Sequence, residues 1–321
     1  MKKALFITAL ACLLAACGPR KTAEVQKESL RPFPVLTSVP SVYQDAEEIA
    51  DYVLEHFWDA FFSEGGRNDT SAILGVATKE VEQALSNFIS ILPEVPMPRA
   101  QKAVGHLFDQ ISAAQQADTS SHVYTRMTEM VANYLYDPNS PLRSEDYYLP
   151  FVKALAASPL TGEDYRPGYE YQARMCSLNQ YGQKVPDFTF RDIKGRNHTL
   201  YGVKAYRTML FFSNPGCHAC KGIIEEVMSR PYMEEYLRRG VVAVVNVYID
   251  EELDKWREYA PTYPKSWLSG YDYRFKIRSD EEYNVRAIPS LYLLDSEKRV
   301  LMKDVPTERV LAFLDRLQPA E

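Results

Sequence analysis

Two cysteines separated by two residues stand in the segment SNPGCHAC, residues 213–220. Such a pair can be a dithiol that exchanges disulfides, half of a zinc site or a haem attachment site. Haem attachment requires a histidine directly after the second cysteine, and Lys221 occupies that position. Structural zinc needs four ligands, usually from a second Cys or His pair, and no such pair follows. The sequence therefore favours a redox dithiol, Cys217 and Cys220, and predicts no metal or other cofactor.

The residues around this pair suit dithiol chemistry. Residues 207–213 form an apolar run that predicts a strand ending just before the first cysteine, and a helix is expected to begin there. Only a thiolate attacks a disulfide, and a helix N-terminus lowers the pKa of a cysteine through its dipole and its unpaired N–H groups. We expect Cys217 to attack and Cys220 to resolve the mixed disulfide.

His218 is a third candidate catalytic residue, because it lies between the two cysteines. A protonated imidazole beside a thiolate stabilises the reduced form and makes the couple more oxidising. The alternative is a solvated side chain at the start of a helix.

From about residue 182 onward, strands and helices alternate. Residues 241–249 (VVAVVNVYI) form a continuous β-branched run, which indicates a strand buried on both faces. The other expected strands are 185–190, 198–200, 207–213, 290–294 and 300–303, and the expected helices are 221–239, 251–260 and a final helix from 307. This order predicts an α/β domain.

The preceding segment has the period of α-helices. The expected helices span residues 45–61, 78–92, 99–115, 121–136 and 166–180, and one more begins near residue 144. Asp45 and Glu48 are predicted to form a capping-box-like start. Cys176 falls in the last helix and is expected to be a buried core thiol, the alternative being a third redox thiol.

The amino-terminal 16 residues have the features of a secretory signal: Lys2 and Lys3, then a short apolar stretch. Leu14-Ala15-Ala16-Cys17 resembles a bacterial lipobox, which implies cleavage before Cys17 and its lipidation; an ordinary signal is the alternative. The polar, proline-punctuated residues 17–40 are expected to be a tether. The sequence thus predicts a membrane-anchored lipoprotein that faces the periplasm.

Charge argues against a nucleic-acid partner. The chain of 321 residues carries a formal net charge of −6, and loss of the two signal lysines makes it −8. No block of basic residues remains to bind phosphates.

Residues 182–318 resemble thioredoxin-fold proteins of the TlpA/ResA/CcmG-like group of thiol–disulfide oxidoreductases. The resemblance rests on the segments VPDFTFRDIKG, LFFSNPGCHACK and AIPS leading into LYLLD. It implies that Pro289 is a cis proline lying against the dithiol. The backbone of Ile288 would then pair with an extended substrate segment.

Three positions depart from that family. Phe211 stands where many thioredoxins have a buried aspartate, six residues before the first cysteine, and Ile223 stands where related reductases have a glutamate. Gly216 replaces the usual tryptophan. The proton-handling candidates are Glu225, Glu226 and bound water.

The helical segment, with YLYDPNSPLRSEDYYLPFVKAL, resembles a domain of unknown function found ahead of thioredoxin domains in Bacteroidota lipoproteins. The predicted fold is an α-helical N-terminal domain plus an α/β thioredoxin-like C-terminal domain. The predicted segments are 1–16 (signal), 17–40 (tether), 41–180 (helical domain) and 181–321 (thioredoxin-like domain).

These observations predict a thiol–disulfide oxidoreductase that acts on disulfides of exported proteins and exchanges electrons with a membrane donor or acceptor. A non-catalytic lipoprotein is the competing hypothesis. In it the helical domain would dock a ligand or partner, and the thioredoxin domain would be a retained scaffold. The two missing carboxylates favour that alternative, and the retained cysteines and AIPS segment oppose it.

Overall fold

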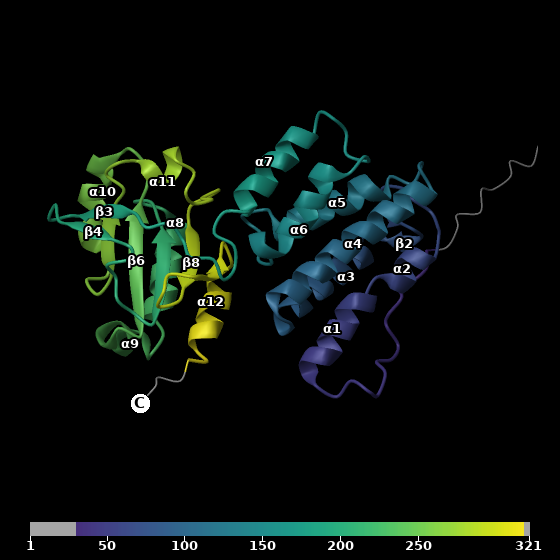
Figure 1. Cartoon of the computed structure of the whole chain (residues 1–321), viewed down its shortest axis with the longest axis horizontal. Coiled ribbons are helices and arrows are strands. Elements are labelled where there is room, and N and C mark those ends of the chain that lie inside the picture. Colours follow the sequence, from purple (N-terminus) through teal and green to yellow (C-terminus); the bar gives the residue numbers. More distant parts are fainter. Residues whose placement is uncertain (1–29, 318–321) are drawn as a thin grey trace, which may run out of the picture.

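A computed structural model describes residues 30–317, which form a helical part followed by a part built on a mixed sheet (Figure 1). The helical part buries one apolar core. Its helices are α1 (Ala46–His56), α2 (Asp59–Ser63), α3 (Thr78–Ile91), α4 (Met97–Ala117), α5 (Val123–Leu135), α6 (Glu145–Ala157) and α7 (Arg166–Cys176), with a short hairpin of β1 (Ala72–Ile73) and β2 (Val76–Ala77).

Helix α6 begins where the sequence predicts it. Ser144 is its N-cap, and the Ser144 side chain accepts a hydrogen bond from the Tyr147 backbone N–H. Such a cap satisfies one of the unpaired donors at a helix start. The cap fixes the place of Glu145, the first residue of the helix, which is completely buried.

The expectation for the first helix was wrong in two respects. The segment 45–61 is two helices, separated at Phe57 and Trp58, and Asp45 makes no side-chain capping bond. Trp58 and Phe61 are both buried in the core. Phe57 and Phe62 are partly buried and pack against the same core.

The second part contains a seven-stranded sheet in the order β4-β3-β7-β6-β5-β8-β9. The strands are β3 (Thr189–Asp192), β4 (Asn197–Thr199), β5 (Arg207–Phe212), β6 (Val242–Tyr248), β7 (Leu268–Tyr271), β8 (Ser290–Leu294) and β9 (Val300–Lys303). The helices are α8 (His218–Met228), α9 (Met233–Arg239), α10 (Leu253–Tyr259), α11 (Lys276–Ser279) and α12 (Thr307–Leu314). Parallel pairs β5–β6 and β6–β7 lie inside antiparallel edges, so the predicted fold class is confirmed.

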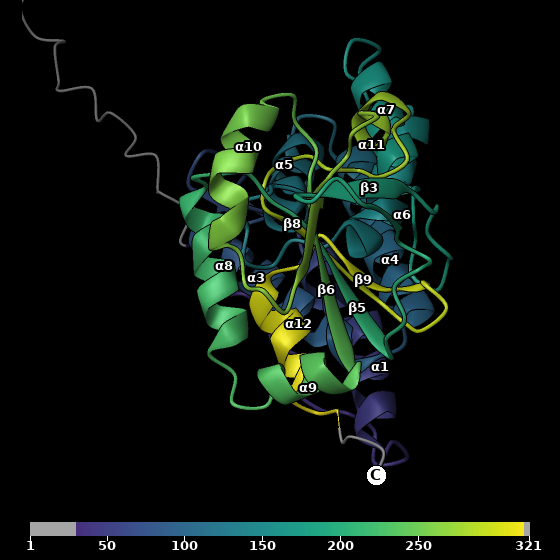
Figure 2. The ribbon, with the colours of Figure 1, turned by 90° about the vertical axis from the view of Figure 1, so that its left-hand side faces the viewer.

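Alternate residues of β5 enter two different cores. Met209 and Phe211 pack with α8, α9 and α12 on one face of the sheet (Figure 2). Leu210 and Phe212 pack on the other face with α11. Because side chains alternate along a strand, β5 is buried on both faces, and this inner strand of the sheet leads into the active-site turn.

Two expectations about the α/β part need correction. The predicted helix 221–239 is two helices, α8 and α9, and strand β7 was not predicted at all. Strand β7 contains Gly270, and a Cβ built there would lie 2.6 Å from the Phe190 ring and 2.7 Å from the Arg191 carbonyl oxygen. This strand therefore needs a glycine, which weakens any strand signal in the sequence.

No helix within residues 30–317 is both long and apolar enough to span a bilayer.

Candidate active site

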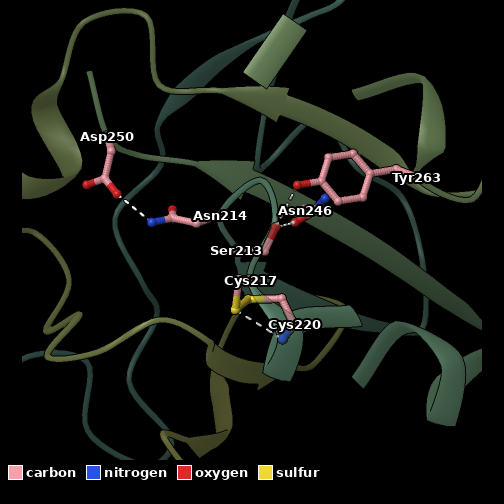
Figure 3. Close-up of a disulfide and its surroundings, with 7 residues drawn as sticks. All are labelled: Ser213, Asn214, Cys217, Cys220, Asn246, Asp250 and Tyr263. Carbon is pink, nitrogen blue, oxygen red and sulfur yellow. Dashed lines mark hydrogen bonds between the residues drawn. A yellow bond between two sulfur atoms is a disulfide. The ribbon is translucent and has the colours of Figure 1, made fainter. Parts of the chain in front are cut away.

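The two cysteines lie where strand β5 gives way to helix α8. Cys217 is the N-cap of the helix, and its Sγ accepts a hydrogen bond from the Cys220 backbone N–H at 3.1 Å. The two cysteines form a disulfide, with their Cα atoms 5.2 Å apart (Figure 3). The thiolate of reduced Cys217 would therefore face unpaired N–H groups and the positive end of the helix dipole, which stabilise it.

The two sulfurs differ in their access to solvent. Cys217 is half-buried, whereas Cys220 is 2% exposed and packs in the same apolar cluster as Phe211. A substrate disulfide can reach the outer sulfur only. The geometry fits an attacking Cys217 and a resolving Cys220.

A tight turn makes this junction possible. The Cys217 backbone N–H donates to the Asn214 carbonyl at 3.2 Å, and Gly216 in the turn has φ +71°. That left-handed conformation disfavours any residue with a Cβ. A glycine here in place of the family's tryptophan thus has a backbone reason.

Asn214 fastens the turn to the neighbouring strand. Its Nδ2 donates to Asp250 Oδ2 at 2.7 Å, just beyond the end of β6 (Figure 3). Asp250 in turn pairs with Arg278 at 2.6 Å, so the turn is fastened to the segment that follows β6.

Sequence reasoning missed a buried polar group beside the active-site turn. The Ser213 hydroxyl donates to Asn246 Oδ1 at 2.6 Å and lies 3.2 Å from the Tyr263 hydroxyl (Figure 3). Burial raises the pKa of Tyr263. One signal was available, because Asn246 interrupts an otherwise apolar strand and a buried amide requires partners.

No carboxylate takes the place of the family's aspartate, since the Phe211 ring fills the core there and meets Trp267 at 6.2 Å between ring centroids. The candidate proton-handling residues Glu225 and Glu226 lie on the surface of α8. Glu225 pairs with Lys221 at 3.6 Å, and Glu226 pairs with Arg230 at 3.7 Å. Burial, followed by the charge of Glu308, raises the pKa of Glu226.

His218 is the first residue of α8 and is exposed. It lies next to the attacking sulfur in the chain, but its effect on the couple stays a prediction.

The predicted substrate-binding pair stands beside the dithiol. Ser290 pairs with Phe212 across β8 and β5, so the residues before Ser290 lie opposite the start of the active-site turn. Ile288 and Cys217 pack against the same apolar cluster. The Ile288–Pro289 peptide bond is cis, as the family resemblance implies, while substrate binding by this pair stays a prediction.

The remaining cysteines have different positions. Cys176 is free, fully buried in the helical core, and burial raises its pKa, which agrees with a core thiol. Cys17 lies outside the described residues. Within residues 30–317, no cluster of three or more His, Cys, Asp or Glu side chains is placed to hold a metal ion.

Comparison with known proteins agrees with this geometry. The chain is 30% identical, over 128 residues, to the thioredoxin-like protein YneN of Bacillus subtilis; the match spans 38% of this chain and 69% of that protein. The chain belongs to the thioredoxin-like family of thiol–disulfide oxidoreductases. It is also 23% identical over 145 residues to the thiol-disulfide oxidoreductase ResA of Geobacillus kaustophilus, across 43% of this chain and 78% of that protein.

The helical part of this thioredoxin-like protein matches a second family. Residues 16–172 match the family described as "Domain of unknown function (DUF5106)". The crystal structure of a thioredoxin-like protein from Bacteroides caccae superposes with a TM-score of 0.75 at 33% identity, and covers 90% of this chain and 100% of that one. The resemblances found in both parts of the sequence are therefore confirmed.

Gly216→Ala is expected to destabilise the folded state by about 1–2 kcal/mol, because alanine must adopt the left-handed conformation. A Cβ at Gly216 meets nothing within 4 Å, so the cost is purely conformational. Urea unfolding measures it.

Gly222→Ala is the matched control. Gly222 lies inside α8, and its Cβ would also meet nothing within 4 Å. Alanine is there expected to stabilise by about 0.5–1 kcal/mol. If both variants shift stability in the same direction, the backbone explanation for Gly216 is wrong.

Proposed function

We propose that this protein is a lipid-anchored thiol–disulfide oxidoreductase that faces the periplasm and reduces or exchanges disulfides of exported proteins. The observation that carries the proposal is the asymmetry of the dithiol. Half-buried Cys217 caps helix α8, and buried Cys220 stands one turn behind it.

In the reducing direction, the Cys217 thiolate attacks one sulfur of a substrate disulfide. A Cys217–substrate disulfide forms, the substrate S–S bond breaks, and the leaving sulfur takes up a proton. The Cys220 thiol then loses its proton, and its thiolate attacks Cys217 to form the Cys217–Cys220 disulfide and release the second substrate thiolate. Two electrons have passed to the substrate, and a dithiol reductant at the membrane restores the pair. Oxidation of a substrate is the same sequence in reverse.

Residues beside the dithiol would present the substrate. Ile288 lies in the segment that enters β8 next to the active-site turn. Its backbone would pair with an extended substrate segment next to the attacked sulfur, as in β-augmentation, so recognition would depend little on substrate side chains.

The proposed anchor rests on the lipobox-like segment of the sequence. Cys17 would carry the lipid, and the predicted tether, residues 17–40, would connect it to the folded body. A lipid chain together with a polar tether would keep the folded body near the membrane surface that supplies its electrons.

The first prediction from the proposed function concerns the activity itself. The wild-type protein is expected to reduce insulin with dithiothreitol as electron donor, and Cys217→Ser is expected to fall to the uncatalysed rate, because no attacking thiolate remains. Insulin turbidity measures the reaction. The control is Cys176→Ser, which removes a buried thiol outside the site and should keep the wild-type rate.

A wild-type protein as slow as Cys217→Ser would contradict the oxidoreductase proposal. It would instead support a binding lipoprotein with a retained thioredoxin scaffold.

A second prediction concerns His218. His218→Ala is expected to shift the dithiol equilibrium with glutathione toward the disulfide by about tenfold, since the reduced form loses a neighbouring positive charge. His218→Lys, which keeps a positive charge at the same helix start, should stay closer to wild type. Equal equilibria for wild type and His218→Ala would show that His218 is only a solvated side chain.

A third prediction concerns location. Expressed in a bacterium that processes lipoproteins, the wild-type protein should sediment with membranes and carry a lipid mass on its N-terminal fragment. Cys17→Ser should carry no lipid mass, because one residue supplies the attachment point. A wild-type N-terminal fragment without a lipid mass would contradict lipid anchoring.

A further inference from the structure

A buried carboxylate of the helical part reaches into the thioredoxin part. Glu145 is 0% exposed, and its Oε1 accepts hydrogen bonds from Asn284 Nδ2 at 2.6 Å and from Arg286 Nε at 2.9 Å. Its Oε2 lies 3.2 Å from Lys303 Nζ. One side chain thus contacts two separate segments of the other part, which meets the α6–α7 end of the helices (Figure 1).

The charges around Glu145 are balanced and enclosed. Arg286 also pairs with Asp304, donates to the Tyr136 carbonyl, and stacks its guanidinium 4.0 Å from the centroid of the Tyr136 ring. Lys303 Nζ, in a side chain that is 0% exposed, donates to the Cys176 and Leu178 carbonyls at 2.7 and 2.6 Å. Loss of one member of such a buried ion pair leaves an uncompensated charge, which strongly destabilises the folded state.

The segment held by Glu145 leads directly to the active site. Asn284 is 4% exposed, and Arg286 stands two positions before Ile288 in the chain. On its other side the same segment is fixed to the thioredoxin core, where the Tyr283 hydroxyl donates to the Pro186 carbonyl at 2.6 Å. Segment 283–289 is therefore held by contacts to both parts of the protein, and its last two residues, Ile288 and Pro289, lead into β8 beside the dithiol.

We propose that Glu145 is a positioning residue for the redox site. Through Asn284 and Arg286 it holds segment 283–289 so that the Ile288 backbone stays aligned for a substrate chain beside Cys217. This assignment rests on the proposed function, and it makes the helical part a working component of the active site. A small thiol needs only access to the Cys217 sulfur, so Glu145 affects the reaction with protein disulfides and leaves the reaction with small thiols unaffected.

The test compares two double variants of the full chain that differ in one acceptor atom. Both carry Lys303→Met, which removes the lysine left without its counter-charge. Glu145→Gln/Lys303→Met keeps an amide oxygen to accept from Asn284 and Arg286, and Glu145→Met/Lys303→Met does not. The readouts are KM and kcat for insulin reduction and the rate of reaction with dithiothreitol alone.

Loss of the acceptor is expected to raise the KM for insulin about tenfold, with kcat and the dithiothreitol rate within about twofold of wild type. The glutamine variant should restore a KM near that of wild type. Arg174→Ala is the control, since it removes an ion pair between Arg174 and Glu281 in the neighbouring loop. The side chains of Arg174 and Glu281 are 53% and 40% exposed. Its KM should not change.

Equal KM values for the two double variants would overturn the assignment. Parallel loss of the insulin and dithiothreitol reactions in the methionine variant would also overturn it, because that result would indicate a purely structural role. If the methionine variant fails to fold, Asn284→Ala replaces it: a raised KM supports the assignment and an unchanged KM overturns it. A wild-type chain that reacts with neither probe would instead overturn the proposed function, and Glu145's role with it.

Discussion

The hydrogen bond from the Cys220 backbone N–H to Cys217 Sγ is the contact on which the chemistry depends. It exists because strand β5 ends at the centre of a covered sheet and helix α8 begins at the next turn. The left-handed Gly216 lets the chain reverse within that space, and burial of Cys220 leaves a single sulfur accessible. A dithiol in this position combines a stabilised thiolate with a resolving thiol that solvent does not reach.

The surroundings of the dithiol combine an apolar core with a buried polar group. The Phe211 ring packs in the same apolar cluster as Cys220, while a hydrogen-bonded group of Ser213, Asn246 and Tyr263 lies beside the active-site turn. Glu145, a fully buried carboxylate, lies instead at the interface of the two parts. An aromatic ring, not a charge, thus lies beside Cys220, and the buried charge of Glu145 joins the helical part to segment 283–289.

The sequence predicted well what depends on local pattern. The strand-to-helix junction at Cys217, the helix start at Ser144 and the hairpin of β8 and β9 each follow from a few adjacent residues. It could not predict strand β7, because the close contact of Gly270 with β3 removes the usual strand residues. Nor could it pair Glu145 with Asn284, since 139 positions separate them and each alone resembles an ordinary polar surface residue.

The redox equilibrium of the Cys217–Cys220 pair tests the central claim most directly. A chain beginning at residue 18 would be titrated with reduced and oxidised glutathione, and its thiols read by alkylation and mass. We expect one two-electron couple between about −270 and −120 mV, with Cys176 remaining a free thiol throughout. A pair that never exchanges with glutathione would show that Cys217 and Cys220 are not a redox-active dithiol.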